Sequence, residues 1–298
     1  MLRLGVESLA VNGTNYLSDV YLPARPTLRP GTREQYALSA RLLDEYSGGI
    51  PVQDWTPELL CGWLASLSGS AATINSKRRA VCTLWSAAVK RAPVEDVPKR
   101  REPRRVPQAW TLAEIEAIQS ECRRQPGTIS GVEACDWWES LLLACFDSGH
   151  RISALLAVEP ADCNLADGWL LIRAETEKTW QDKIFKLADD TLEVLSRHYD
   201  SSRSNLWPWP FHRYTIWRHF RRIVRAAKVR YAGGHCNLFH RIRRTTGSLI
   251  DQHGGSGARH LGVSEAVFRK SYCDPTFTGG AVHLLPRPTP QPTLRVVG

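Results

Sequence analysis

The sequence predicts a mainly α-helical protein with a small β-hairpin, in which a helical domain is followed by a larger α+β domain. Apolar residues recur at helical spacing through much of the chain, and a basic stretch with four prolines, 92–109, interrupts them. Beyond it, two short β-like runs, 168–175 and 182–188, flank a polar turn and predict a hairpin. The first helical stripe comprises Tyr36, Leu38, Leu42, Leu43 and Tyr46.

Composition indicates a folded protein that is neither secreted nor inserted in a membrane. Of its 298 residues, 43% are hydrophobic and 23% are charged, which is typical of globular domains. The longest apolar run, 141–146, is too short to cross a bilayer, and the first residues lack a signal-peptide core. The eight cysteines form no C-x-x-C pair and no zinc spacing, so we expect reduced thiols, no metal site and a cytoplasmic location.

The charge balance favours a polyanionic partner. The chain has 39 Lys and Arg against 30 Asp and Glu, a formal net charge of +9. Two basic clusters stand out, at 99–105 and at 218–230, and the arginines of the second repeat at helical spacing. Such a stripe could cover several phosphates, or it could be the solvated face of a helix.

The first half of the chain predicts a helix bundle. One helix follows residue 31, a second begins with Thr56 as its N-cap and Pro57 at its first position, and a third covers 70–92. The expected divisions are an N-terminal arm (1–27), a helical domain (28–92), a basic proline-rich linker (93–109), a second domain (110–275) and a proline-rich tail (276–298). We expect the tail to be disordered unless it docks on a partner.

The second domain opens with Thr111 and Glu114 in the capping-box pattern, and helix continues to about Phe146. In the hairpin that follows, Lys178 lies near the tip, and Lys183 and Lys186 lie in the second run. Helical patterns then return at 191–198, 213–228 and 239–252.

Breaking a DNA phosphodiester without a metal requires a nucleophile, cations on the non-bridging oxygens and an acid for the leaving oxygen. Arginine suits the cation role because its planar fork matches phosphate oxygens and keeps its charge. In the segment HRIRR, His240 and Arg243 share one face of a helix, so both can reach the same phosphate.

Four segments, in order, resemble the sequence boxes of tyrosine recombinases of the phage integrase family. SGHRISALLAVEPAD resembles the box that holds the first catalytic arginine, at Arg151. WLLIRAETEKTWQDKIFKLA resembles the family's β-hairpin, with Lys178 as its lysine. FHRIRRTTGSLIDQHGG matches the box with the catalytic pair, at His240 and Arg243. HLGVSEAVFRKSYCDP resembles the L-G-H-x(8)-Y segment and places the nucleophile at Tyr272.

The resemblance implies a site-specific recombinase that needs neither metal, ATP nor another cofactor. Arg151 and Arg243 would stabilise the transition state, Lys178 would protonate the leaving 5′-oxygen, and His240 would take the proton of Tyr272. The product would be a 3′-phosphotyrosyl link. The first domain resembles the family's core-binding domain, which implies double-stranded DNA with a specific recombination site as substrate, a homodimer on each site, a tetramer in synapsis and association with the nucleoid.

Three positions depart from the family's pattern. Val263 occupies the position of a His or Trp that donates to the phosphate, Ala154 replaces a Glu, and Arg244 replaces a His. His260, three residues before Val263, is either a substitute donor or a surface residue. These departures predict a slower enzyme with its main machinery retained.

The basic residues expected to contact DNA lie on the third helix and in the linker. They are Lys77, Arg78, Lys99, Arg100, Arg101, Arg104 and Arg105.

Alternative functions are a catalytically silent DNA-binding protein with the same fold, which Val263 favours, and an enzyme like type IB topoisomerases, with the same chemistry but no synapsis. A membrane-surface protein is disfavoured because the basic helices lack a wide Trp/Leu face.

Overall fold

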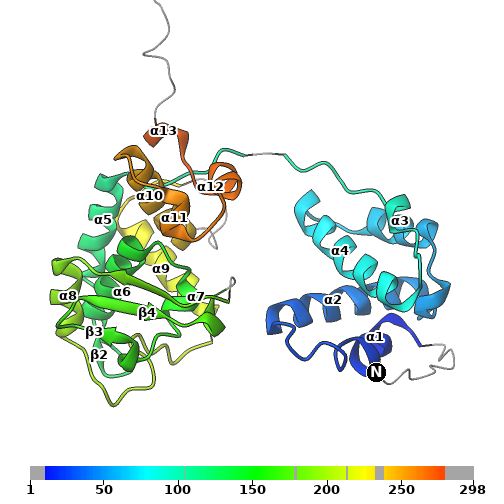
Figure 1. The fold of residues 1–298 in the computed structure, drawn as a ribbon, viewed down its shortest axis with the longest axis horizontal. Helices are drawn as coiled ribbons and strands as arrows, with labels where there is room; N and C mark the ends of the chain where they lie inside the picture. Colours follow the sequence, from blue (N-terminus) through cyan, green and yellow to red (C-terminus); the bar gives the residue numbers. More distant parts are fainter. Residues whose placement is uncertain (1–10, 104, 178–179, 213, 232–237, 279–298) are drawn as a thin grey trace, which may run out of the picture. The chain divides into compact units, whose positions relative to one another are not determined.

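The computed structural model describes most of the chain as two compact units, Met1–Arg104 and Arg105–Gly298 (Figure 1). No helix in the described part has the length and hydrophobicity needed to span a bilayer. The described residues are 11–103, 105–177, 180–212, 214–231 and 238–278.

The first unit is a helix bundle whose boundaries follow local capping rules. The Thr56 side chain accepts from the Leu59 amide at the start of one helix, and Ser70 accepts from Thr73 at the start of the next. Apolar side chains from all the longer helices form one core, which includes three tryptophans. The elements are α1 Gly13–Tyr16, η1 Leu17–Tyr21, α2 Pro30–Ser47, η2 Val52–Asp54, α3 Pro57–Ser66, α4 Ala71–Ala88 and η3 Val94–Asp96.

This unit begins earlier than the sequence predicted. Residues 1–27 were expected to form an arm, but Leu17 and Tyr21 are only 2% and 4% exposed and belong to the core. The Asp44 carboxylate on α2 accepts hydrogen bonds from the amides of Gly13 (2.9 Å) and Thr14 (2.8 Å). The helical turns before residue 28 are too short to give a recognisable apolar period, and tertiary contacts hold them.

The second unit surrounds α6, a central helix that is buried along most of its length. α5, α8 and α10 pack against α6, and a three-stranded antiparallel sheet of order β3-β4-β5 lies in the same unit (Figure 1). In the sheet, Leu170 of β4 pairs with Phe185 of β5. The predicted mainly helical fold with a small β-hairpin is therefore confirmed, whereas Lys178 lies outside the described residues.

The elements of this unit, in chain order, are α5 Leu112–Cys122, β1 Thr128–Ile129, β2 Val132–Glu133, α6 Ala134–Ser148, α7 Ile152–Leu155, η4 Pro160–Asp162, β3 Cys163–Asn164, β4 Trp169–Ile172, η5 Ala174–Thr176, β5 Lys183–Lys186, α8 Asp189–Ser196, α9 Thr215–Ala226, α10 Leu238–Gln252, α11 Gly257–Leu261, α12 Glu265–Ser271 and α13 Pro275–Thr278. The sequence did not reveal the short β1–β2 pair or β3.

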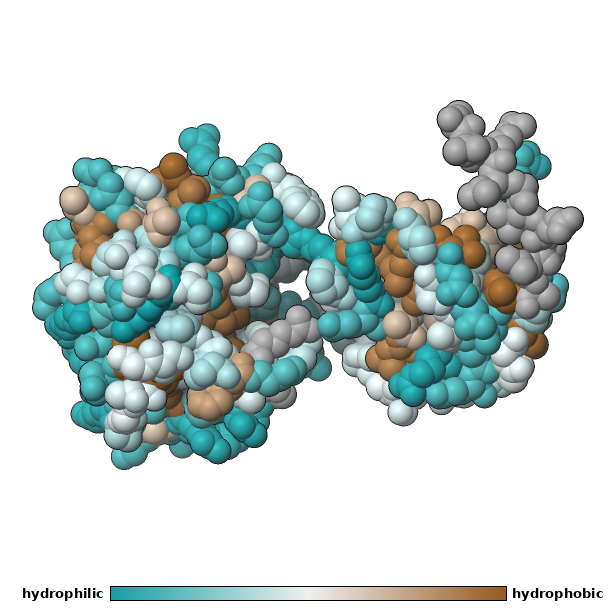
Figure 2. All heavy atoms as spheres, turned by 90° about the horizontal axis from the view of Figure 1, so that it is seen from below, coloured by the Kyte–Doolittle hydropathy of each residue, from teal (hydrophilic) through white to brown (hydrophobic). Residues whose placement is uncertain are grey.

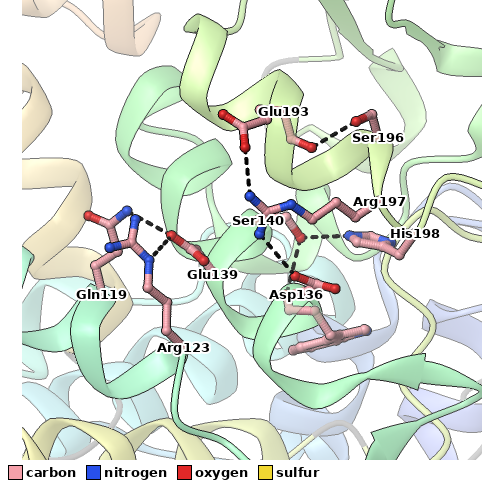
Figure 3. A network of polar contacts seen from close by, with 10 residues as sticks. Gln119, Arg123, Asp136, Glu139, Ser140, Glu193, Ser196, Arg197 and His198 are labelled. Carbon is pink, nitrogen blue, oxygen red and sulfur yellow. Dashed lines mark hydrogen bonds and ion pairs between the residues drawn. The ribbon is translucent and has the colours of Figure 1, made fainter.

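Polar side chains on α6 form hydrogen bonds with α5 and with the residues that follow α8 (Figure 3). Glu139, 2% exposed, accepts from Gln119 Nε2 (2.9 Å) and Arg123 Nε (2.6 Å) at the end of α5. One residue on, Ser140 Oγ lies 2.8 Å from His198 Nε2, just after α8. Because a buried carboxylate and a buried hydroxyl each have partners on the neighbouring elements, these contacts hold α5 and the end of α8 against α6.

Hydrophilic residues cover most of the face seen in Figure 2, with only small hydrophobic patches between them. The apolar residues that form the two cores are correspondingly buried. Each unit therefore has its own interior, as expected of a domain.

Candidate active site

Arg151 is positioned by a sharp turn between two helices. α6 ends at Ser148, and its C-cap residue Gly149 has a left-handed φ of 59°. Glycine suits this position because it tolerates that φ and because a Cβ there would overlap the Leu261 side chain. The chain then turns, and Arg151 becomes the extended N-cap residue of α7. Its Nη1 lies 3.3 Å from Oε2 of Glu177.

Arg243 lies on α10 and is almost fully buried, with 1% of its surface exposed. Its guanidinium donates to the carbonyls of Gly149 and Leu261, the latter at 2.7 Å. Both carbonyls are at helix C-termini, where the helix dipole is negative. The guanidinium carbon lies 4.9 Å from the centroid of the Tyr272 ring, so Arg243 and Tyr272 share one site.

Tyr272 follows α12, a helix that begins at the Ser264 cap. Burial by itself raises the pKa of the Tyr272 hydroxyl, whereas the charges of Arg243 and Arg151, and hydrogen bonds with both, lower it; the net pKa is below its usual value. The arginines therefore favour the phenolate, which is the nucleophilic form.

His240 lies one turn before Arg243 on α10, as predicted from the sequence. Burial, followed by the charges of Arg244, Arg243 and Arg151, lowers the pKa of His240 to about 4. The imidazole is therefore neutral at pH 7 and can accept a proton or a hydrogen bond.

Lys183, which the sequence analysis did not select as catalytic, also reaches this site. It opens β5, and its Nζ lies 3.6 Å from Oε2 of Glu177, the same oxygen that meets Arg151. Its ammonium lies so close to Gly262 that a Cβ there would overlap it. The available signal was its place in the predicted hairpin; its contact with Glu177 could not be read from spacing.

The departures from the family pattern have distinct surroundings. Val263 packs against a small apolar cluster around Phe268, beside Tyr272. His260 is half-buried, and its Nε2 lies 3.0 Å from the Asp147 carbonyl oxygen, so it is engaged with the end of α6. Ala154 is buried at 1% exposure.

Arg244 is half-buried behind the tyrosine. Its Nε donates to the Ser271 carbonyl (3.1 Å) and its Nη1 lies 3.4 Å from the Gln108 carbonyl oxygen. The Arg244 side chain thus extends from α10 to the peptide bond that precedes Tyr272.

The basic residues expected to contact DNA differ in their availability. Arg78 donates to the carbonyls of Val97 (2.5 Å) and Val94 (2.8 Å), and Arg100 donates to that of Leu64 (2.6 Å). These two guanidinium groups hold the chain after α4 against the bundle. Lys77 is half-buried and Arg104 lies outside the described residues. Arg100 is exposed but engaged with Leu64, and the other exposed members are Lys99, Arg101 and Arg105.

Within the described residues, no group of three or more His, Cys, Asp or Glu is placed to hold a metal ion, and no disulfide joins the cysteines there. The site contains two arginines next to Tyr272, Arg151 and Arg243, and Lys183 shares a carboxylate oxygen of Glu177 with Arg151. Such a set suits an anion with several oxygens, and a phosphate ester fits it best.

In this site, two arginines lower the pKa of a tyrosine and a neutral histidine lies beside them. A site of this class is suited to nucleophilic attack on phosphorus. Solved structures agree on the fold. The chain is similar to a lambda integrase dimer bound to a COC′ core site (TM-score 0.63, 15% identity, covering 91% of this chain and 78% of that one). It is similar to a lambda integrase tetramer bound to a Holliday junction (0.65, 16%, 85% and 74%) and to XerH site-specific recombinase bound to palindromic difH substrate (0.65, 17%, 89% and 81%).

The chain therefore has the tyrosine recombinase fold. No protein-family model and no curated protein matches the sequence. At this level of identity, the similarity concerns the fold alone.

Proposed function

We propose that this protein is a site-specific tyrosine recombinase that cleaves and rejoins double-stranded DNA through a 3′-phosphotyrosyl intermediate. The observation that carries the proposal is the position of Tyr272 against Arg243, whose guanidinium carbon is 4.9 Å from the ring centroid. Arg243 donates to the carbonyls of Gly149 and Leu261, but carbonyls carry only partial charges and do not fully offset the cost of burying a cation. A phosphate between Arg243 and Arg151 would supply the opposite charge.

In the proposed reaction, the Tyr272 oxygen attacks the scissile phosphorus and its proton passes to the neutral His240. The bond from phosphorus to the 5′-oxygen breaks, and that oxygen takes a proton from a lysine, which leaves a free 5′-hydroxyl. Arg151 and Arg243 stabilise the charge on the non-bridging oxygens of the transition state. Attack by a 5′-hydroxyl of another strand reverses these steps, so the covalent bond conserves the energy for rejoining.

The geometry favours Lys183 as the lysine that protonates the leaving oxygen. Glu177, 1% exposed, accepts from both Arg151 and Lys183 and so fixes the amine beside the arginine that binds phosphate. Lys178, expected from the sequence for this role, lies outside the described residues and is the competing candidate.

We also propose the partners and the assembly by analogy. The similar structures are a dimer on a core site and a tetramer on a Holliday junction, and we infer the same stages for this chain. The exposed cations Lys99, Arg101 and Arg105 are the members of the predicted DNA-binding set that are best placed to meet phosphates.

Covalent capture of DNA tests the nucleophile. A bound site is first selected from a random duplex library, and a nick next to the scissile phosphate then makes cleavage irreversible. We expect wild type to form an adduct that survives denaturation, and Tyr272→Phe to bind the same DNA with similar affinity but to form no adduct. Binding without capture by wild type would identify a silent DNA-binding protein and refute the enzymatic proposal.

A substrate with sulfur in place of the leaving 5′-oxygen tests the lysine. A thiolate leaves without protonation, so loss of the general acid is repaired on this substrate only. We expect Lys183→Ala to cleave ordinary DNA about 10²- to 10⁴-fold more slowly and to recover on the sulfur substrate.

Lys186→Ala is the matched control, because Lys186 lies on the same strand but is exposed and binds the Asp167 carbonyl. It should cleave both substrates at the wild-type rate. If Lys178→Ala shows the selective recovery and Lys183→Ala does not, Lys178 is the acid.

A further inference from the structure

The residues that open the second unit are hydrogen-bonded to the segment that carries Tyr272. The Ala109 amide donates to Oδ2 of Asp274 at 2.7 Å, and Asp274 is only 5% exposed. One residue on, the Trp110 amide donates to Thr245 Oγ1 of α10 at 2.7 Å, and the Trp110 side chain is fully buried. The chain 106–110 is thus anchored on α10 and, two residues beyond the nucleophile, on Asp274.

A second connection reaches the other side of Tyr272. Arg244 donates through Nε to the Ser271 carbonyl (3.1 Å) and through Nη1 to the Gln108 carbonyl (3.4 Å). The same guanidinium therefore contacts the peptide before the nucleophile and the residue before Ala109. Neither connection involves the groups that face the phosphate in the proposed mechanism.

Between these two connections, the backbone of Tyr272 rests on α10. Ser248 Oγ donates to the Tyr272 carbonyl (3.3 Å) and accepts from the Asp274 amide (2.9 Å). α12 has only seven residues, which is too short for a helix to be stable by itself. The tyrosine therefore depends on these tertiary hydrogen bonds for its position.

We propose that Arg244 and Asp274 are positioning residues through which the chain segment 106–110 sets the place of Tyr272. This inference rests on the proposed function. Segment 106–110 directly follows the boundary between the two units, which lies between Arg104 and Arg105, so a displacement of this segment is passed to the nucleophile on both sides. Because attack on phosphorus requires the reacting atoms to be positioned to within a fraction of an ångström, the position of segment 106–110 controls the cleavage rate of bound DNA.

A pair of proline substitutions tests this coupling. Ala109→Pro removes the amide that donates to Asp274, because proline has no N–H. Val106→Pro is the matched control: it places the same residue in the same segment, at a position that is 63% exposed. We expect Ala109→Pro to slow single-turnover cleavage about tenfold with DNA affinity unchanged, and Val106→Pro to cleave like wild type.

A second pair acts from the other partner and separates positioning from folding. Asp274→Asn keeps a side-chain oxygen that can accept from Ala109, whereas Asp274→Leu does not. We expect Asp274→Asn to retain a cleavage rate close to wild type and Asp274→Leu to resemble Ala109→Pro. If Ala109→Pro fails to fold, this pair decides the question.

Hydrogen exchange of the DNA-free protein gives a readout that does not need catalysis. Peptides covering 264–278 should exchange faster in Ala109→Pro than in Val106→Pro, even if no DNA is ever cleaved. Equal exchange in the two variants, or equal cleavage by them, overturns the inference. Faster exchange with no cleavage by wild type would refute the proposed function and leave the coupling in place.

Discussion

The two units differ in what they bury. Among the described residues of the first unit, the buried polar side chains are Ser39 and Asn75, and the remainder of the core is apolar. The second unit buries Arg243, Glu177 and Glu139 together with several other charged or titratable groups, and all nine histidines of the chain lie after residue 149. The first unit is thus held by apolar packing, whereas the second maintains charges in its interior.

The buried charge of Arg243 is unfavourable for the folded second unit in the absence of an anion. Burial lowers the pKa of Arg243, which indicates that its charged form is poorly solvated, and the nearby charge of Arg151 acts in the same direction. Sites prepared for a ligand commonly carry such unfavourable terms, which the ligand relieves. The first unit therefore has the properties of a scaffold, whereas the second has the properties of a ligand-binding site.

The largest effect is expected from matched substitutions of two arginines that each donate to two carbonyls. Arg243→Met should slow cleavage of bound DNA about 10²- to 10³-fold, because a preorganised cation at the transition state is lost. Arg78→Met, in the first unit, leaves the carbonyls of Val97 and Val94 without their donors and should lower the free energy of unfolding by about 1–2 kcal/mol. Its bound complex should cleave at the wild-type rate.

Single-turnover cleavage at saturating protein and denaturant unfolding measure the two effects separately. Equal losses of cleavage rate in both variants would show that the contrast between the units is wrong. Arg78→Lys serves as a control, since it restores one donor and should recover part of the stability.

The same contrast explains what the sequence could reveal. Helices of the first unit follow from local signals, such as the caps at Thr56 and Ser70, and the candidate site follows from the order of its sequence boxes. The role of Glu177 could not be predicted, because its partner Arg151 is 26 residues away. The contact between Trp110 and Thr245, 135 residues apart, depends in the same way on the folded chain.

Acid should unfold the second unit selectively. Burial is the first cause that lowers the pKa of His150 to about 3, of His198 to about 4 and of His240 to about 4. An unfolded histidine titrates near 6.5, so between that pH and about 4 the unfolded state binds more protons than the folded state. The contribution of these groups is complete above pH 6.5 and is lost as the pH falls.

Because the first unit contains no histidine, its stability should change little between pH 6.5 and 5, a range in which ordinary carboxyl groups remain ionised. Each buried histidine of the second unit should cost about 2 kcal/mol over the same range. Hydrogen exchange at the two pH values, compared for peptides of each unit, measures this difference. His198→Gln should flatten the pH dependence of the second unit, whereas the exposed His253→Gln should leave it unchanged. A parallel loss of protection in both units would instead mean that acid acts on surface charge throughout the chain, and not on the buried imidazoles.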